Sequence, residues 1–500
     1  MNVYELFRER TRNATAFILS PDLEVQFSYD DLDRYSATCA SHMRDLGIGP
    51  GDRVMVQVAK SPRALFLYFA CLRLGAIYLP LNTAYLDEEL AYFVSDAEPA
   101  LIVCDPLKSS YFASLGDHRV ITMDAEGYCS LLDGGQAEFT TTALDDSDIA
   151  VILYTSGTTG RPKGAMISHG NLAVNGLALH EAWQWRPGDV MLHALPIFHI
   201  HGLFVATHLP VLNGSPIIFL PGFDAEQVAA LIASDDACRP TVYMGVPTHY
   251  TRLTASGKLS PAAAAGMRLF TSGSAPLLEQ TFHTFHEQTG HEIVERYGMT
   301  ETGMNTSNPL DGRRKPGTVG LPLAGVEIRV TDENGLDCTP GEPGDLLVRG
   351  DNVFQGYWKL PGKTAAEFTA DGFFRTGDIA MLDDDGYVSI VGRNKDMIIS
   401  GGLNVYPREI EDVIDRIEGV SESAVIGLPH PDFGEGVCAV IVPEQGYELS
   451  GNEILAALKN RLANFKIPKW IFFASSLPRN TMGKVQKNLL REQYEREARA

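Results

Sequence analysis

Short apolar runs alternate with helical stretches through most of the chain, and each run ends in small or turn-forming residues. The clearest examples are 150–154 (AVILY), 241–247 (TVYMGVP), 267–276 (MRLFTSGSAP) and 292–298 (EIVERYG). This alternation predicts layered α/β sheets, in which ligands bind at the carboxyl ends of the strands. An α/β class is therefore expected for the first part of the chain.

The pattern changes after Gly341. Segments 344–350 (GDLLVRG) and 386–393 (GYVSIVGR), with the turn 383–386 (DDDG), predict short β-hairpins. From Lys395 onward we expect helices near 407–416 and 452–463 and strands at 423–428, 438–443 and 470–474. We therefore predict an N-terminal domain, 1–392, and a small α+β C-terminal domain, 393–500.

Composition excludes several classes of protein. The net charge of −22 argues against a basic nucleic-acid-binding surface, so anionic ligands would need local cations. The longest apolar run, 64–72 (ALFLYFACL), is too short to span a membrane and predicts a buried helix. The charged start, 1–13 (MNVYELFRERTRN), gives no sign of a secretory signal. Seven scattered cysteines without a C-x-x-C pair favour a reducing, cytoplasmic location. The oligomeric state stays open.

The segment 154–164 (YTSGTTGRPKG) follows a predicted buried strand and is rich in glycine and hydroxyl groups. Such a loop offers many backbone N–H groups and little bulk, which suits a polyphosphate; a flexible surface turn is the alternative. The common phosphate-loop pattern does not fit, because Lys163 is followed by Gly164 rather than Ser or Thr. A kinase-type glycine loop is also absent.

Several segments in this order resemble the adenylate-forming superfamily of acyl-CoA synthetases, peptide-synthetase adenylation domains and firefly-type luciferases. They are 154–172 (YTSGTTGRPKGAMISHGNL), 195–203 (LPIFHIHGL), 273–277 (GSAPL), 295–303 (ERYGMTETG), 357–364 (YWKLPGKT), 373–378 (FFRTGD), 391–411 (VGRNKDMIISGGLNVYPREIE) and 477–487 (LPRNTMGKVQK). The resemblance implies a large N-terminal domain of layered α/β sheets and a small, mobile α+β C-terminal domain.

Within the superfamily, segments 78–85 (YLPLNTAY), 244–253 (MGVPTHYTRL) and 295–312 (ERYGMTETGMNTSNPLDG) are most similar to the malonyl-CoA synthetases. Such enzymes activate malonate or methylmalonate with ATP, release diphosphate, and transfer the acyl group from AMP to coenzyme A. Three alternatives stay open: a ligase for another short, fatty or aryl acid; a peptide-synthetase module, although no carrier domain follows; and a non-catalytic nucleotide-binding protein.

The resemblance assigns the nucleotide site residue by residue. The β- and γ-phosphates would be held by Thr155, Ser156, Gly157, Thr158, Thr159, Gly160 and Lys163. The adenine would be bound by Ser274, Ala275 and Pro276 and by the run Glu295, Arg296, Tyr297 and Gly298, and the α-phosphate by Thr300. Glu301 would bind Mg²⁺, a hard cation that prefers oxygen ligands. Asp378 would bind the ribose, with Arg393 beside it.

Lys484 is the residue that the resemblance makes central to catalysis. It would reach from the C-terminal domain to the reacting carboxylate and the α-phosphate and offset their negative charge. Lys395 matches the hinge about which that domain rotates before CoA reacts, and Gly401 and Gly402 would line the pantetheine tunnel. His199 matches the gate between the acid pocket and the nucleotide.

A diacid brings a second anion into the pocket, and burying that anion unpaired is very costly. Arg252 is our candidate for its partner because guanidinium grips carboxylate with two hydrogen bonds, and His201 would assist. Arg268 competes with Arg252 for this role. Ser272, Gly273 and Met304 would limit the pocket to a short acid. The H-x-H pair could also suggest a metal, but we see no third ligand.

Overall fold

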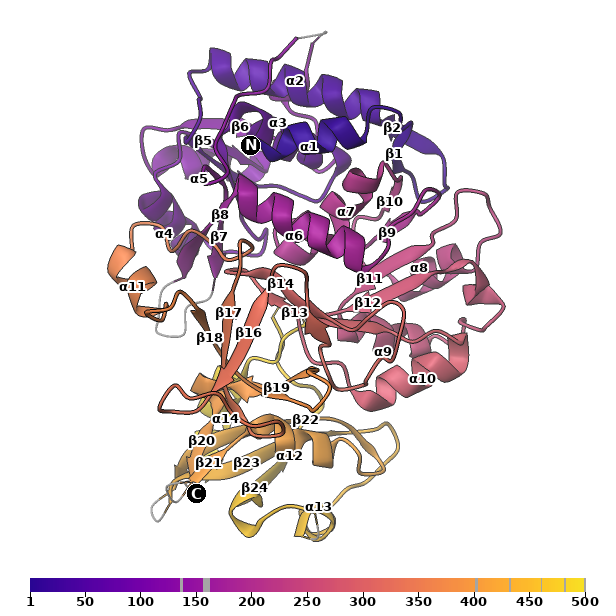
Figure 1. Cartoon of the computed structure of the whole chain (residues 1–500), viewed down its shortest axis with the longest axis vertical. Helices are drawn as coiled ribbons and strands as arrows, with labels where there is room; N and C mark the ends of the chain where they lie inside the picture. Colours follow the sequence, from indigo (N-terminus) through magenta and orange to yellow (C-terminus); the bar gives the residue numbers. More distant parts are fainter. Residues whose placement is uncertain are drawn as a thin grey trace.

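The computed structural model describes residues 1–134, 138–155, 162–400, 403–430, 433–459, 461–480 and 483–498. A large N-terminal body carries two sheets, and a smaller C-terminal domain lies at one end of it, with a third sheet between them (Figure 1). The expected fold class, layered α/β with a small α+β domain, is thus confirmed.

The first sheet has the order β6-β5-β3-β4-β7-β8 and is parallel except for β8. Its central strands β3, β4 and β5 are almost wholly buried, as expected for a parallel sheet that is covered on both faces, whereas the edge strand β6 is partly exposed. The strands are β3 (Arg53–Gln57), β4 (Ile77–Pro80), β5 (Leu101–Cys104), β6 (Arg119–Thr122), β7 (Ile149–Thr155) and β8 (Lys163–Ser168).

The second sheet has the order β15-β14-β13-β12-β11-β9-β10-β1-β2, with a parallel centre from β13 to β1. The segment after β13 lies near the first sheet, since the hydroxyl of Thr155, at the end of β7, lies 3.5 Å from the Glu301 carboxylate. The strands are β1 (Ala16–Leu19), β2 (Val25–Ser28), β9 (Met191–His193), β10 (Ile217–Phe219), β11 (Val242–Gly245), β12 (Leu269–Ser272), β13 (Val294–Met299), β14 (Gly303–Ser307) and β15 (Leu321–Pro322).

Helices fill the space between these sheets and cover their outer faces. The apolar run at 64–72 lies in α3, whose residues from Ala64 to Leu74 are all buried, as the sequence predicts. Ser61 caps its start and Gly75, at φ 82°, ends it. The helices are α1 (Val3–Arg10), α2 (Tyr29–Asp45), α3 (Pro62–Leu74), α4 (Asp87–Ala97), α5 (Ser109–Ser114), α6 (His169–Ala182), α7 (Ala206–Asn213), α8 (Ala225–Ile232), α9 (Pro247–Ala255), α10 (Glu279–Thr289) and α11 (Pro361–Ala366).

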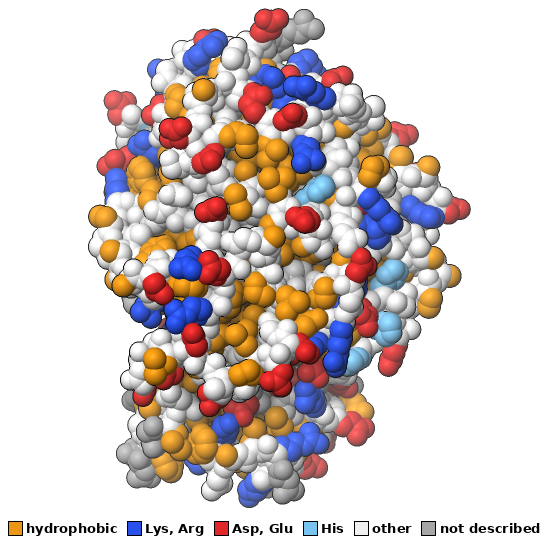
Figure 2. All heavy atoms as spheres, in the orientation of Figure 1, with side chains coloured by type: hydrophobic (Ala, Val, Ile, Leu, Met, Phe, Trp, Pro, Cys, Tyr) orange, Lys and Arg blue, Asp and Glu red, His pale blue; other side chains and the backbone are white. Residues whose placement is uncertain are grey.

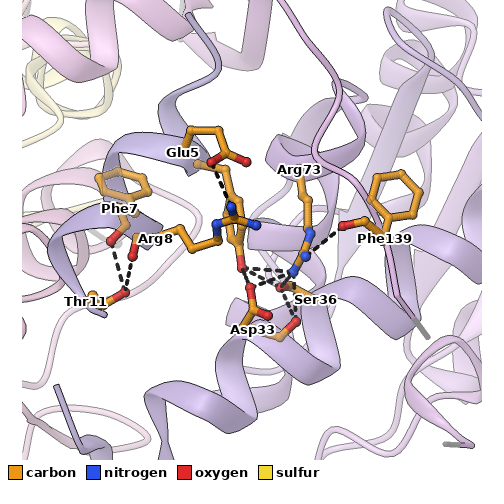
Figure 3. A network of polar contacts seen from close by, with 9 residues as sticks. Glu5, Phe7, Arg8, Thr11, Asp33, Ser36, Arg73 and Phe139 are labelled. Atoms are coloured by element: carbon orange, nitrogen blue, oxygen red, sulfur yellow. Dashed lines mark hydrogen bonds and ion pairs between the residues drawn. The ribbon is translucent and has the colours of Figure 1, made fainter. Parts of the chain in front are cut away.

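A buried arginine joins three of the N-terminal helices (Figure 3). The Nη1 group of Arg73, on α3, donates to the Asp33 carboxylate at 2.9 Å, to the Asp33 carbonyl at 2.9 Å and to the Tyr4 hydroxyl at 3.2 Å. Its Nη2 group donates to the Phe139 carbonyl at 2.8 Å. The charge is paired and widely hydrogen-bonded, as a buried charge in a structural role should be.

The third sheet, β16-β17-β18-β19, is antiparallel and leads into the C-terminal domain. The expected turn at 383–386 joins its last two strands. The strands are β16 (Glu327–Thr331), β17 (Gly344–Arg349), β18 (Phe374–Leu382) and β19 (Val388–Arg393).

The C-terminal domain has a five-stranded sheet with its own apolar core on each face. Ile410, Ile414 and Leu458 pack on one face, and Leu490 and Tyr494 on the other. All the helices and strands expected after Lys395 occur. They are β20 (Ile398–Ser400), β21 (Leu403–Val405), α12 (Pro407–Ile414), β22 (Val420–His430), β23 (Gly434–Pro443), α13 (Gly451–Lys459), β24 (Trp470–Phe473) and α14 (Lys487–Ala498).

Acidic and basic side chains are interspersed over the face shown in Figure 2. All seven cysteines are free. Among the described residues, none of the helices has the length and apolar content that crossing a bilayer requires.

Gly320 joins the second sheet to the third. Its carbonyl accepts from the Val388 N–H, and its φ of +83° is one that L side chains rarely adopt. A Cβ at this position would lie 2.0 Å from the Ser307 carbonyl carbon, where backbone leaves no room to relax.

We predict that Gly320→Ala destabilises the large domain by about 2 kcal/mol or more. Chemical denaturation followed by tryptophan fluorescence measures the change. Gly362→Ala, where a Cβ meets nothing within 4 Å, is the matched control and should change stability by less than about 1 kcal/mol. Equal midpoints for the two variants would contradict the prediction.

Candidate functional site

The loop predicted to hold phosphates joins β7 to β8. Thr155 and Lys163 are paired across these two antiparallel strands, so the two ends of the loop lie side by side. Ser156, Gly157, Thr158, Thr159 and Gly160 lie outside the described residues. The Lys163 ammonium lies 4.2 Å from the centre of the Tyr357 ring, and burial lowers its pKa.

Glu301 is a buried carboxylate beside this hairpin. Its Oε1 accepts from the Tyr357 hydroxyl at 3.0 Å and from Thr155 Oγ1 at 3.5 Å. Burial raises the pKa of Glu301, while the positive charges of Arg393 and Lys163 oppose that rise. Thr300 precedes it at the end of β13. A single carboxylate fits Mg²⁺, which usually takes its other ligands from phosphates and water.

Asp378 lies on β18 and is 3% exposed. Its carboxylate accepts from the Tyr297 hydroxyl at 2.5 Å and pairs with Arg393 Nε at 3.0 Å. The structure therefore brings together three residues that the sequence places far apart. Tyr297 thus borders the space where a sugar bound to Asp378 would lie.

The loop after β12 carries Ser274, Ala275 and Pro276. Ser274 adopts a φ of +73°, which is unusual for a residue other than glycine and marks local strain. Its hydroxyl lies 3.3 Å from His201 Nδ1. The loop thus borders both the expected adenine position and the expected acid pocket.

Lys484 comes from the C-terminal domain and meets the groups of the large body. The neighbouring Gly483 lies against Thr248 of α9, since a Cβ on Gly483 would be 3.4 Å from its hydroxyl. Burial lowers the pKa of Lys484 to about 8, helped by the positive charges of Arg393 and Arg296 and opposed by Asp378 and Glu301. The ammonium group therefore lies within electrostatic reach of both the ribose and the acid sides of the site.

His199 and His201 lie at the start of a π-helical turn, His201–Val205, that precedes α7. Burial, Lys484 and Arg296 lower the pKa of His199 to about 3. Burial and Arg296 hold the pKa of His201 well below its ordinary value. Both imidazoles are therefore neutral at pH 7 and can donate one N–H each.

Arg296 is the main surprise of the site. The sequence assigns it to the nucleotide through its motif, yet its guanidinium packs against Gly273, and a Cβ there would lie 2.4 Å from Cζ. Arg296 is 3% exposed, and burial lowers its pKa to about 10, so it stays charged at neutral pH. Neighbouring residues in a strand point to opposite faces, so alternation along β13 separates Arg296 from Tyr297, whose hydroxyl contacts Asp378.

The other residues predicted for the acid pocket differ in their exposure and in their contacts. Arg252 lies exposed on α9. Arg268 forms a two-bond ion pair with Asp189, at 2.6 and 2.9 Å, so it is engaged in a structural contact instead. Ser272 and Met304 are buried, with Met304 packed against Gly298, where a Cβ would be 2.7 Å from its methyl carbon.

Two further predictions concern Glu295 and the hinge. The Glu295 carboxylate accepts from the Gly317 N–H at 3.2 Å, so its side chain contacts the loop at Gly317, and burial raises its pKa to about 8. Lys395 is exposed in a short turn, Asn394–Asp396, between β19 and β20. Gly401 and Gly402 lie outside the described residues.

No cluster of three His, Cys, Asp or Glu residues able to hold a metal occurs in the described chain.

Family models match both parts of the chain. The AMP-binding enzyme model covers residues 5–358, and the model of the AMP-binding enzyme C-terminal domain covers residues 409–484. A feruloyl-CoA synthase from Amycolatopsis sp is 35% identical over 93% of this chain and 94% of its own length. A mitochondrial malonate–CoA ligase of Mus musculus is 36% identical over 84% of this chain and 78% of its own length.

A solved structure gives a stronger match. The crystal structure of ATP-bound MatB from Rhodopseudomonas palustris is 49% identical, covers 98% of this chain and 99% of that one, and has a TM-score of 0.94. The apo structure of the same MatB has a TM-score of 0.85 at the same identity. Over the whole chain, this structure is thus more similar to the ATP-bound form of that MatB than to its apo form.

The depressed pKa of Lys484 gives a direct prediction. In an NMR titration of isotope-labelled lysine side chains, one signal should titrate near pH 8, and Lys484→Ala should remove it. The same substitution should raise the pKa of His199, because it removes a positive charge that lowers it. A Lys484 signal that titrates only near pH 10.5 would contradict this geometry.

Proposed function

Because the chain belongs to the AMP-binding enzyme family, we propose that it is an AMP-forming malonate–CoA ligase acting on malonate or methylmalonate. The observation that carries this proposal is the positive charge of the acid side of the site, where the charge of Arg296 helps to lower the pKa of Lys484. A monoacid offers one anion to these cations, whereas a diacid offers two. The similarity to malonate–CoA ligases supports the choice.

In the first half-reaction, a malonate carboxylate oxygen attacks the α-phosphorus of ATP, and the bond to the diphosphate oxygen breaks. Lys484 would neutralise charge as two anions approach, and the rate gain would come from positioning and electrostatics. Asp378 would orient the ribose through its carboxylate, releasing contacts with Tyr297 and Arg393. Thr155, Lys163 and the intervening loop would hold the departing diphosphate.

Glu301 is the residue that would hold Mg²⁺. When bound, this ion would neutralise negative charge on the phosphates. Tyr357 and Thr155 orient the carboxylate by hydrogen bonds to Oε1, which leaves Oε2 for the ion. Magnesium rather than a softer metal fits this all-oxygen donor set.

In the second half-reaction, the CoA thiol attacks the acyl carbonyl, AMP leaves, and the thiol proton is lost. Lys484 occupies the acid side of the site, so the C-terminal domain would rotate about Lys395 before CoA enters. Gly401 and Gly402 would then border the pantetheine arm. The C-terminal domain suits such a movement, because its core is its own.

The substrates ATP, malonate and CoA are the partners that this function requires. The seven free cysteines support a reducing compartment such as the cytoplasm.

The main alternative is a ligase for another acid, which the similarity to a feruloyl-CoA synthase favours. Against it stands the buried charge of Arg296, which an aromatic acid would leave unpaired.

A panel of acids tests the proposed function. With CoA and ATP present, diphosphate release should be fastest with malonate or methylmalonate, and at least about 100-fold slower with octanoate and ferulate, which cannot pair the second cation. Preference for either control acid over malonate would refute the diacid assignment. Failure of every acid, together with no ATP–diphosphate exchange, would favour a non-catalytic protein.

Two variants separate the half-reactions. Lys484→Ala should slow adenylate formation about 100-fold or more, yet leave thioester formation from supplied malonyl-adenylate intact. Lys395→Pro should do the reverse, because proline fixes the hinge backbone. Single-turnover assays of each step measure both effects. Loss of the same half-reaction in both variants would contradict rotation about Lys395.

A further inference from the structure

Lys60 is a cation of the large body that the proposed mechanism does not use. It lies between β3 and α3, directly before Ser61, which caps the start of α3. Burial holds the pKa of Lys60 well below its ordinary value, and no carboxylate among the described residues opposes that fall. A positive charge at the start of a helix is also unfavourable, because the helix dipole is positive there. Burial and helix formation therefore both disfavour a charged lysine at this position.

The ammonium group of Lys60 contacts His193, the last residue of β9. Its Nζ lies 3.0 Å from Nδ1 of His193 and donates to the His193 carbonyl, also at 3.0 Å. Nζ lies 4.3 Å from the centre of the Phe219 ring, which is a favourable position for a cation. Phe219 ends β10, the strand beside β9 in the second sheet (Figure 1). The ammonium group is thus held at the carboxyl ends of two parallel strands, where ligand-binding residues gather in α/β proteins.

The proton of the His193 imidazole can be assigned from the neighbours of the ring. Its Nε2 lies 2.9 Å from the carbonyl oxygen of Gly202, which can only accept, so Nε2 carries the proton. Burial and the charge of Lys60 hold the pKa of His193 well below its ordinary value, so the ring is neutral. Nδ1 is then an acceptor, and Lys60 supplies its donor. Without this donor, a buried acceptor would lose its hydrogen bond, which is costly.

The Gly202 carbonyl belongs to the π-helical turn that begins at His201. Thr207 Oγ1 donates to the same carbonyl at 2.8 Å, so two buried side chains hold this one oxygen. A Cβ on Gly202 would lie 2.0 Å from the Pro196 carbonyl oxygen, so the turn packs directly on the segment that follows β9. The His201 N–H lies 3.3 Å from Nδ1 of His199 and donates to it. π-helical turns are rare and are frequent at functional sites.

We propose, on the basis of the function proposed above, that Lys60 is a positioning residue for the acid that reacts. It acts through His193, because its ammonium group holds the imidazole as the Nε2–H tautomer. His193 then holds the Gly202 carbonyl, and with it the turn that places His201 on the acid side of the site. Lys60 itself touches no substrate.

The test compares Lys60→Met with Lys60→Gln. The two replacement side chains are equally long, but only glutamine keeps an N–H donor for His193. Lys60→Met should lower kcat/KM for malonate about tenfold or more and change the KM for ATP by less than about threefold, because the turn lies on the acid side. Lys60→Gln should restore kcat/KM to within about threefold of the wild type. Lys258→Met, at an exposed lysine that pairs with Glu226, is the control and should behave as the wild type.

Two measurements show whether Lys60 acts through His193. In the wild type, NMR of isotope-labelled histidine should show the His193 proton on Nε2, and Lys60→Met should shift the Nδ1 resonance, whereas Lys258→Met should not. When His193→Leu is already present, adding Lys60→Met should lower kcat/KM for malonate by less than about threefold further. A proton on Nδ1 in the wild type, or full additivity of the two substitutions, would overturn the inference.

Activity separates this inference from the proposed function. Equal losses toward malonate and ATP with a lowered Tm would show that Lys60 has a structural role and would overturn the inference. If the wild type uses malonate and Lys60→Met keeps its kcat/KM, the inference is wrong and the proposed function stands. If the wild type prefers another acid, the diacid assignment fails and the variants are compared with that acid. A loss in Lys60→Met then supports the inference, and an unchanged value overturns it.

Discussion

The site depends on the accumulation of buried positive charge in a protein whose net charge is −22. Burial lowers the pKa of Lys484 to about 8, and the positive charges of Arg393 and Arg296 add to this fall, against Asp378 and Glu301. Nothing in folding favours such proximity, because like charges repel and burial adds a desolvation penalty. Under the proposed function, the anionic groups of a nucleotide and an acid would compensate this cost.

The sequence predicts much of this molecule because long, ordered motifs fix the fold and many site residues. The strands ending at Thr155, Ser272 and Met299 follow from apolar runs and their polar ends. The contact between Asp378 and Tyr297 follows only from tertiary structure, since the two lie on different sheets. The sequence places each residue in a motif, but it does not show which motifs lie next to one another in the folded structure.

For the predicted acid pocket, the sequence could not distinguish exposed arginines from buried ones. Arg252 was selected because it lies in a segment typical of the subfamily, whereas its side chain is exposed on α9. The resemblance places Arg296 among the nucleotide-binding residues, in the run Glu295–Gly298 that also contains Tyr297. Period-two alternation along β13 separates these two neighbours, and burial then distinguishes the arginines. The positions of charged residues in the sequence do not by themselves distinguish a buried arginine from an exposed one.

The C-terminal domain packs both faces of its sheet with its own helices. Its contacts with the large body include polar ones, such as the ion pair of Arg416 with Glu279 at 2.8 Å. A lid built in this way is modular: it can be exchanged between homologues without repacking either hydrophobic interior. Recombination at the short turn after Arg393 would then graft a lysine loop from one enzyme onto the acid specificity of another.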